Sequence, residues 1–188
     1  MKNVEVITLS RKNLTDFASA RNGALKKSKK EWALFLDSDE KISPAEIDPV
    51  LLDDEFSGYY LKRKNYFLGQ YVGSDRIIRL GKRNSGEWAR RVHEVWKIKG
   101  KVGRINSPVI IHNTAESLSD YIKKINFYST LHAKANGEED KTPSLLKIIL
   151  YPGLKFFETY LKSRHPVFSI MQAFHSFLAW SKLYFLRS

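Results

Sequence analysis

Three acidic side chains stand within four positions at Asp37, Asp39 and Glu40, directly after the apolar run 32–36. Carboxylate oxygens are hard ligands that suit Mg²⁺ or Mn²⁺. Clustered carboxylates also repel one another, so a bound cation would stabilise their grouping. The spacing therefore predicts a divalent-metal site, and a solvated acidic turn after a core strand is the alternative.

The residues around this cluster predict the elements that position it. A short, continuous apolar run such as 32–36 is typical of a strand buried on both faces of a parallel sheet. The carboxyl end of such a strand is where open α/β sheets bind their ligands. Residues 4–9 predict an opening strand, and residues 14–30 predict a helix, capped by Thr15 or Asp16, that leads into the acidic strand.

The middle third of the chain is predicted to be rich in strands with basic faces. Strands are expected at residues 58–66, 74–80, 92–98, 102–105 and 107–112, separated by glycine-containing turns, and a short helix with loops is expected at 42–56. The last strand ends at His112, whose imidazole is a possible late metal ligand. The alternative for His112 is a strand-end histidine with structural hydrogen bonds.

From Ser117, a predicted helix cap, the apolar period becomes helical. Two apolar helical segments, 144–161 and 167–186, are expected, with breaks at Pro152 and Pro166. A polar stripe interrupts the last segment, which favours a helix lying in a membrane surface over one that spans the membrane. Packing against the catalytic domain or a partner subunit is the alternative. We therefore predict a catalytic domain at 1–115 and a helical region with a basic amphipathic tail at 116–188.

Composition limits the classes of partner and function. The net charge of +12 implies an anionic partner, which could be nucleic acid, an anionic membrane face or a phosphorylated substrate. The hydrophobic fraction of 43% excludes general disorder, and the absence of cysteine excludes disulfides and thiolate metal sites. A basic, aromatic nucleic-acid-binding module is one alternative, but it leaves the acidic cluster unexplained, so nucleic acid is not expected as the partner.

Five short motifs then occur in a characteristic order: ARN at 20–22, LDSDE at 36–40, NYFLG at 65–69, DRIIRL at 75–80 and RVHE at 91–94. In this order they resemble family 2 glycosyltransferases, and among these the enzymes that add hexoses to the inner core of lipopolysaccharide or lipooligosaccharide. The resemblance runs from about Asn13 to the C-terminus. It implies an α/β fold, a partial type A glycosyltransferase (Rossmann-like) fold with a mixed sheet, followed by a helical, membrane-facing segment. The first nucleotide-binding βαβ units of that fold are almost wholly absent from the sequence.

The resemblance also implies a reaction and roles for individual residues. It implies inverting, metal-dependent transfer of a hexose, with glucose as first candidate, from a UDP-sugar to a lipid-linked or phosphorylated core oligosaccharide. Asp39 would hold Mg²⁺ or Mn²⁺, and Asp37 would contact the ribose or assist the metal through water. Glu94 would be the base that takes the proton of the acceptor hydroxyl, and His93 would orient the acceptor or reach the metal.

Further positions are implied at the nucleotide-sugar site. Arg21 and Asn22 match the family's residues near the nucleotide, and Asp75 and Arg76 are candidates for binding donor sugar or acceptor phosphates. The alternatives are an exposed helical arginine at position 21 and a structural ion pair at Asp75.

The enzyme is expected in the cytoplasm, peripheral at the inner face of the cytoplasmic membrane. A truncated, non-catalytic remnant or one half of a split enzyme is the alternative to an active protein.

Overall fold

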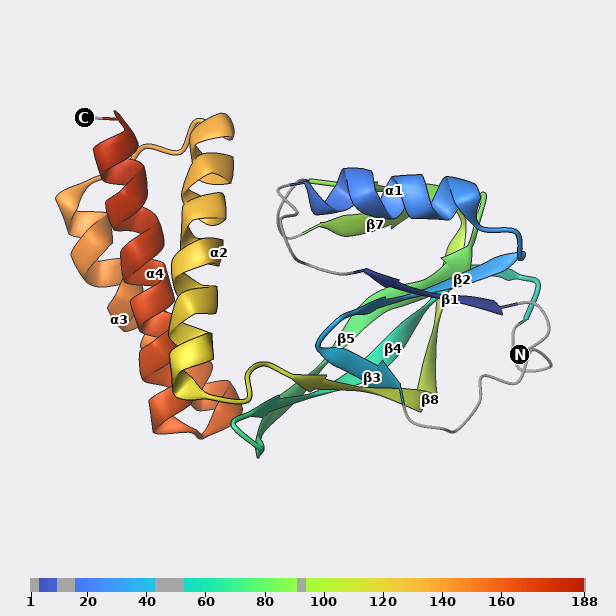
Figure 1. Cartoon of the computed structure of the whole chain (residues 1–188), viewed down its shortest axis with the longest axis horizontal. Coiled ribbons are helices and arrows are strands. Elements are labelled where there is room, and N and C mark those ends of the chain that lie inside the picture. The colour runs from blue at the N-terminus through green and yellow to red at the C-terminus, as the bar shows by residue number, and fades with distance from the viewer. Residues whose placement is uncertain (1–3, 10–15, 43–52, 91–93, 188) are drawn as a thin grey trace. The chain divides into compact units, whose positions relative to one another are not determined.

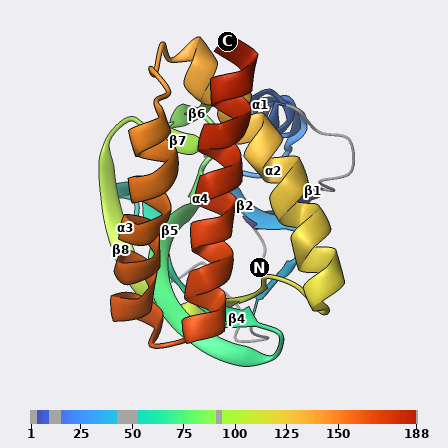
Figure 2. The same ribbon diagram turned by 90° about the vertical axis from the view of Figure 1, so that its left-hand side faces the viewer.

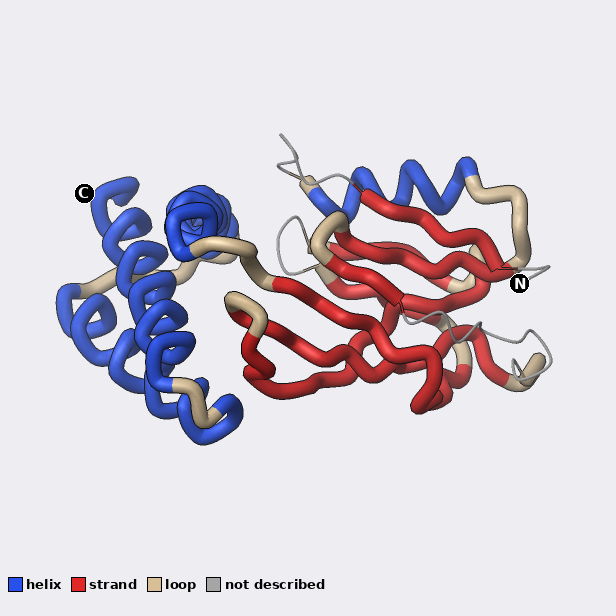
Figure 3. Tube along the Cα trace, turned by 60° about the horizontal axis from the view of Figure 1, so that its bottom comes forward, coloured by secondary structure: helices blue, strands red, loops and turns tan. Residues whose placement is uncertain are grey.

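The computed structural model describes residues 4–9, 16–42, 53–90 and 94–187, and these divide into two compact units. The first, here called the sheet unit, comprises residues 1–65 and 74–113. The second, the helical unit, comprises residues 66–73 and 114–188. Figure 3 shows that strands dominate the first unit and helices the second. The division at 113/114 lies close to the expected boundary at 115/116, and the hairpin tip 66–73 joins the helical unit.

The described strands form one mixed sheet and one small ribbon (Figure 1). The sheet order is β1 (Val4–Leu9), β2 (Trp32–Asp37), β5 (Gln70–Lys82), β4 (Phe56–Phe67), β8 (Lys101–Asn113) and β3 (Glu40–Ile42). β1 runs parallel to β2, whereas β5 pairs with β2 and β8 pairs with β3 in antiparallel register. The predicted α/β class with a mixed sheet is confirmed, and the arrangement is compatible with a Rossmann-like fold.

Strand β2 lies between the two hydrophobic clusters of the sheet unit. All six of its residues are buried, and Ala33, Leu34 and Phe35 are completely inaccessible to solvent. One face packs against Leu61 and Leu80, and the other packs against helix α1 (Phe17–Lys27) and the ribbon. Burial on both faces is therefore confirmed. The expectation of a parallel sheet holds only on the β1 side, since the neighbour on the other side is antiparallel.

Helix α1 begins where its cap supplies an acceptor. The Asp16 carboxylate accepts a hydrogen bond of 2.9 Å from the backbone N–H of Ser19, which satisfies one of the unpaired donors of the first turn. Of the two predicted caps, Asp16 is confirmed, and Thr15 lies outside the described residues. Lys26 and Lys27 occupy the last turn, where they complement the helix dipole.

The ribbon pairs β6 (Gly86–Ala89) with β7 (Val95–Ile98). Trp88 and Trp96 face each other in this register and stack with ring centroids 5.1 Å apart. The edge of Phe35 meets both rings, at 5.3 and 5.4 Å, which attaches the ribbon to the core of the sheet unit.

In the strand-rich region, one expectation differs from the structure and another cannot be compared with it. The predicted strands 102–105 and 107–112 form a single strand, β8, that continues through Pro108. A proline removes one backbone donor, but its fixed φ is compatible with extended chain, so it need not end a strand. The helix and loops expected at 42–56 fall mostly on residues 43–52, which lie outside the described residues.

The helical unit contains α2 (Leu118–Glu138), α3 (Leu145–Ser163) and α4 (Pro166–Arg187). Ser117 caps α2 as predicted, accepting from the N–H of Asp120 at 3.1 Å. The predicted break at Pro166 is also confirmed, because proline at the first helical position loses no intrahelical hydrogen bond. The predicted break at Pro152 is wrong: α3 runs through this residue, and extensive packing of α3 on α4 compensates for the lost hydrogen bond.

Helix α4 packs on both α2 and α3, and Figure 2 shows it between them. The core of the helical unit also includes the hairpin tip, whose Phe67 packs edge-on against Tyr121 with ring centroids 5.0 Å apart. Among the described helices, none has both the length and the apolar character needed to cross a bilayer.

Candidate active site

Helix α1 and strand β2 bring Arg21 and Asp37 into a buried ion pair. Arg21 has no solvent exposure, and its Nη2 donates to Asp37 Oδ1 at 2.5 Å. The same guanidinium donates through Nε and Nη2 to Glu94 Oε1, at 3.0 and 2.8 Å. Arg21 also stacks over Trp88, with 4.5 Å from Cζ to the ring centroid. The alternative of an exposed helical arginine is therefore wrong, and the structure brings Arg21, Asp37 and Glu94 together.

Strand β5 adds Arg79, which sequence reasoning did not single out. Its Nη2 lies 2.8 Å from Asp37 Oδ2 and 3.5 Å from Glu40 Oε1, and its Nη1 lies 3.9 Å from Glu94 Oε1. Burial lowers the pKa of Arg79, although the charge of Asp37 opposes this shift. One feature of the sequence could have identified Arg79: it lies between apolar residues of a predicted strand, where burial is expected. A buried arginine requires carboxylate partners.

Glu40 holds the turn that follows β2. Its Oε2 accepts the backbone N–H of Asp37 at 3.0 Å, and its Oε1 accepts from Arg63 at 3.0 Å. Arg63 continues to Asp75 through two hydrogen bonds, at 3.0 and 2.6 Å. Burial acts to lower the pKa of Arg63, but the hydrogen bonds and charge of Asp75 outweigh it and raise that pKa. Asp75 therefore forms the structural ion pair that was one of its two interpretations.

Asp39 and His112 lie together because β3 pairs with β8. The register places Glu40 opposite His112, and Asp39 Oδ2 is 3.5 Å from His112 Nε2. The other ring nitrogen, Nδ1, lies 2.9 Å from Asn65 Oδ1. An amide oxygen only accepts, so Nδ1 carries the proton of the neutral ring and Nε2 carries a lone pair. Nε2 has no hydrogen-bond partner among the described residues. This arrangement is the usual one for a metal-binding histidine.

These contacts test how well the predicted metal ligands fit a divalent ion. Asp39 and His112 fit as a pair, since a carboxylate oxygen and an imidazole lone pair face each other at a partly accessible position. Asp37 fits less well as a direct ligand, because both of its oxygens accept from arginines and its side chain is 1% exposed. Within the part of the chain that the structure describes, no three potential ligands cluster around a common point.

The network contains both arginines and carboxylates. Among the described residues, three guanidinium groups contact four carboxylates: Arg21, Arg63 and Arg79 contact Asp37, Glu40, Asp75 and Glu94. Asp39 and His112, a carboxylate and an imidazole 3.5 Å apart, lie outside these arginine contacts and suit a cation.

Asn22, Arg76 and His93, the other predicted site residues, lie elsewhere or outside the described residues. The Asn22 amide donates to the Trp88 carbonyl at 2.9 Å and accepts from the Trp88 N–H at 2.8 Å, which attaches α1 to β6. Arg76 is exposed and donates to the Ile105 carbonyl and to Asn106, at 3.1 and 2.5 Å. His93 lies outside the described residues, so its role in orienting the acceptor or reaching the metal stays a prediction.

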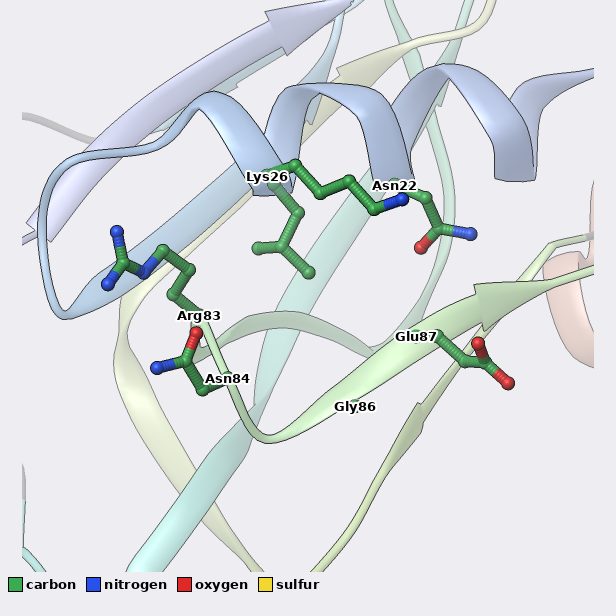
Figure 4. Close-up of a pocket in the computed structure, with 7 residues that line it drawn as sticks. Asn22, Lys26, Arg83, Asn84, Gly86 and Glu87 are labelled. Carbon is green, nitrogen blue, oxygen red and sulfur yellow. The ribbon is translucent and has the colours of Figure 1, made fainter.

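A pocket of about 380 Å³ opens beside α1, within the sheet unit. Figure 4 shows Asn22 and Lys26 of α1 opposite the segment that carries Arg83, Asn84 and Glu87. Of the predicted site residues that the structure describes, only Asn22 lines it. This pocket is therefore distinct from the arginine–carboxylate network.

The Arg63–Asp75 pair should make stability depend on pH. Burial raises the pKa of Asp75, but the hydrogen bond and charge of Arg63 outweigh it and lower that pKa. A lowered folded-state pKa contributes stability above the unfolded value, about 3.9, and this contribution is lost as the pH falls through the folded value. We expect Asp75→Asn to cost at most about 1 kcal/mol at pH 6, because the pair is partly exposed, and less at pH 3. Urea unfolding of both proteins at each pH measures this; a cost that does not shrink on acidification would contradict it.

No family model matches the chain. A lipopolysaccharide core biosynthesis glycosyltransferase, LpsC of Rhizobium meliloti (strain 1021), is 30% identical over 158 residues, which cover 78% of this chain and 58% of that protein. The chain thus spans a little over half the length of this relative. The similarity supports a relationship between the chain and glycosyltransferases.

Proposed function

We propose that this chain takes part in glycosyl transfer during lipopolysaccharide core biosynthesis, as a family 2 type hexosyltransferase. The observation that carries the proposal is the buried network that unites Arg21, Asp37 and Glu94, three residues of separate motifs, in a chain similar to LpsC. The donor is a UDP-hexose, with glucose as first candidate. The acceptor is a lipid-linked or phosphorylated core oligosaccharide, and transfer inverts the anomeric carbon.

Asp39 and His112 are the residues that would hold the divalent ion, Mg²⁺ or Mn²⁺. Such an ion, when bound, neutralises the negative charge that grows on the departing diphosphate. Asp37, which is engaged by Arg21 and Arg79, keeps an indirect role: it orients the two guanidinium groups beside the donor site. Arg21 retains a buried donor, Nη1, with no hydrogen-bond partner among the described residues, and a phosphate or uracil oxygen would satisfy it.

Glu94 is the group to which we assign proton removal from the acceptor hydroxyl. In the described part of the chain, the contacts that hold its carboxylate all use Oε1. Oε2 is therefore the atom assigned to accept the proton, while Arg21 and Arg79 fix the orientation of the group. The side chain is 13% exposed, so an acceptor can reach it without unfolding of the site.

The acceptor class implies where the enzyme works. A lipid-linked saccharide is confined to a membrane, and the basic helical unit suits the anionic inner face of the cytoplasmic membrane. We therefore place the protein in the cytoplasm, peripheral at that face.

Titration of the purified chain with UDP-glucose, with and without Mn²⁺, tests the proposal. We expect binding to tighten when Mn²⁺ is present. Asp39→Asn should remove this Mn²⁺-dependent gain, at least about tenfold in affinity, because an amide oxygen is a weaker ligand than a carboxylate. Asp54→Asn is the matched control, since the Asp54 side chain is 96% exposed. Calorimetry measures the affinities, and circular dichroism checks the fold.

Two results would count against this assignment. Unchanged Mn²⁺ dependence in Asp39→Asn would remove Asp39 as a metal ligand. Failure of the unmodified chain to bind UDP-glucose under any condition would favour the non-catalytic alternative.

A further inference from the structure

Helix α3 carries a continuous apolar face that the helical unit does not cover. Its members are each between 51% and 71% exposed: Leu145, Leu146, Ile149, Leu150, Leu154, Phe157 and Leu161. Their spacing keeps them on one side of an α-helix, over a length of about 24 Å. Contiguous exposed apolar surface of this extent is uncommon on soluble proteins and marks an interaction surface.

The packing of the helical unit explains why this face is free. Helix α4 packs on both α2 and α3, so α3 is an outer helix (Figure 2). Thr159, the buried residue of α3, lies on the opposite side of the helix from the apolar face.

Charges on α3 indicate the kind of surface it meets. Lys147, Lys155 and Lys162 lie outside the apolar face, and Glu158 is the acidic residue of the helix. Lys147 Nζ donates to the Thr142 carbonyl at 2.6 Å and lies 5.4 Å from the centroid of the Trp180 ring. Glu158 accepts from Lys155 at 3.0 Å and from Lys162 at 2.5 Å. Three cations and one anion leave α3 with two net positive charges. A second copy of the same cationic helix would be repelled, whereas an anionic lipid surface would be attracted.

We propose that the outward face of α3 (the seven residues named above) docks on a bilayer that contains anionic phospholipid, with the helix axis in the plane of the membrane. The apolar side chains enter the boundary between headgroups and acyl chains, and the net positive charge of the helix is attracted to the anionic headgroups. The helix cannot span the bilayer while its other side stays packed on α4. The inference rests on the proposed function only for placing the acceptor at a membrane.

The proposed membrane contact lies on α3, whereas the sequence favoured the last segment of the chain. On α4 the exposed apolar residues Val167, Ile170, Phe174 and Phe177 are between 40% and 56% exposed, and Phe185 and Leu186, in the last turn, are 78% and 60% exposed. Ser169, Ala179 and Leu183 of the same helix are buried within the helical unit. Before its last turn, α4 therefore presents less accessible apolar side chains than α3, because α4 has neighbours on two sides.

Vesicle co-sedimentation of the full chain tests the proposal. We expect binding to phosphatidylcholine vesicles that contain phosphatidylglycerol, and weaker binding without phosphatidylglycerol or at high salt. The double variant Ile149→Glu/Leu154→Glu should lower partitioning about 100-fold, roughly tenfold for each apolar side chain that is replaced by a charge. The matched control Ile170→Glu/Phe174→Glu adds the same charges to α4, and its binding should fall less than tenfold.

A second measurement does not depend on charge substitution. The chain contains no cysteine, so single cysteines can be labelled selectively. A polarity-sensitive fluorophore on Leu154→Cys should shift to shorter wavelength with anionic vesicles, whereas the same label on Ile122→Cys of α2 should not. Circular dichroism melting of every variant confirms that the helices remain folded.

Several outcomes would overturn the proposal: unchanged vesicle binding of the α3 double variant, no spectral shift at position 154, or a dimer that dissociates in the α3 double variant without vesicle binding by either protein. The last would make a second copy the occupant. Vesicle docking by a chain that fails to bind UDP-glucose would support the α3 assignment and count against the proposed function.

Discussion

Glu94→Gln should abolish sugar transfer while leaving UDP-glucose binding within about twofold of the unmodified chain. The amide keeps the shape of the carboxylate and can still accept from Arg21 through its oxygen, so the network around Asp37 is retained. It cannot accept the proton of the acceptor hydroxyl. Loss of a positioned general base typically lowers the rate 10² to 10⁴-fold, and we expect about that loss in kcat.

The experiment needs a separate measurement of binding and turnover. Calorimetry gives the affinity for UDP-glucose, and release of UDP in the presence of core oligosaccharide gives kcat. Glu87→Gln is the matched control, because Glu87 is exposed on β6 and lies outside the network. Near-normal turnover of Glu94→Gln would eliminate Glu94 as the base.

Arg21→Met should destabilise the sheet unit by about 3–5 kcal/mol, as expected when one partner of a buried ion pair is removed. Methionine fills much of the same volume but removes the positive charge that pairs with Asp37 and Glu94. Both carboxylates are largely buried, so water compensates little for this loss. Arg79 remains near both groups, which keeps the loss at the lower end of the range. Urea unfolding monitored by tryptophan fluorescence measures the change.

Lys27→Met is the control for this second prediction. It removes the same unit of charge from the same helix at an exposed position, and it should change the free energy of unfolding by less than about 1 kcal/mol. Equal effects of the two substitutions would show that the arginine–carboxylate network contributes little to stability.

Local pattern was enough to predict the framework that carries the site. The burial of β2, the caps Asp16 and Ser117, and the acidic turn after β2 each depend on residues a few positions apart. Hydrophobic periodicity and capping residues predict such local structure directly from neighbouring positions. The mixed character of the sheet followed from the resemblance rather than from the pattern, and so did the idea that Arg21, Asp37 and Glu94 belong together.

The contacts between side chains of the site could not be predicted from local pattern. Arg21 meets Glu94 across 73 positions of chain, and Arg79 meets Asp37 across 42, so each contact exists only once the sheet has paired. For the same reason Arg79 was overlooked: its strand pattern shows a charged residue, but not whether that residue is buried. The pairing of β3 with β8, which joins Asp39 to His112, is equally non-local.

The amino-acid sequence by itself determined the strand before the acidic turn, the positions of most helix ends and the basic, apolar character of the C-terminal region. Tertiary structure decided which carboxylates face which arginines, that α3 continues through Pro152, and that the exposed apolar face belongs to α3. The physical reason is the range of the interactions. Helix caps and periods depend on neighbours within one or two turns, whereas burial, ion pairing and exposure depend on segments that only folding brings together.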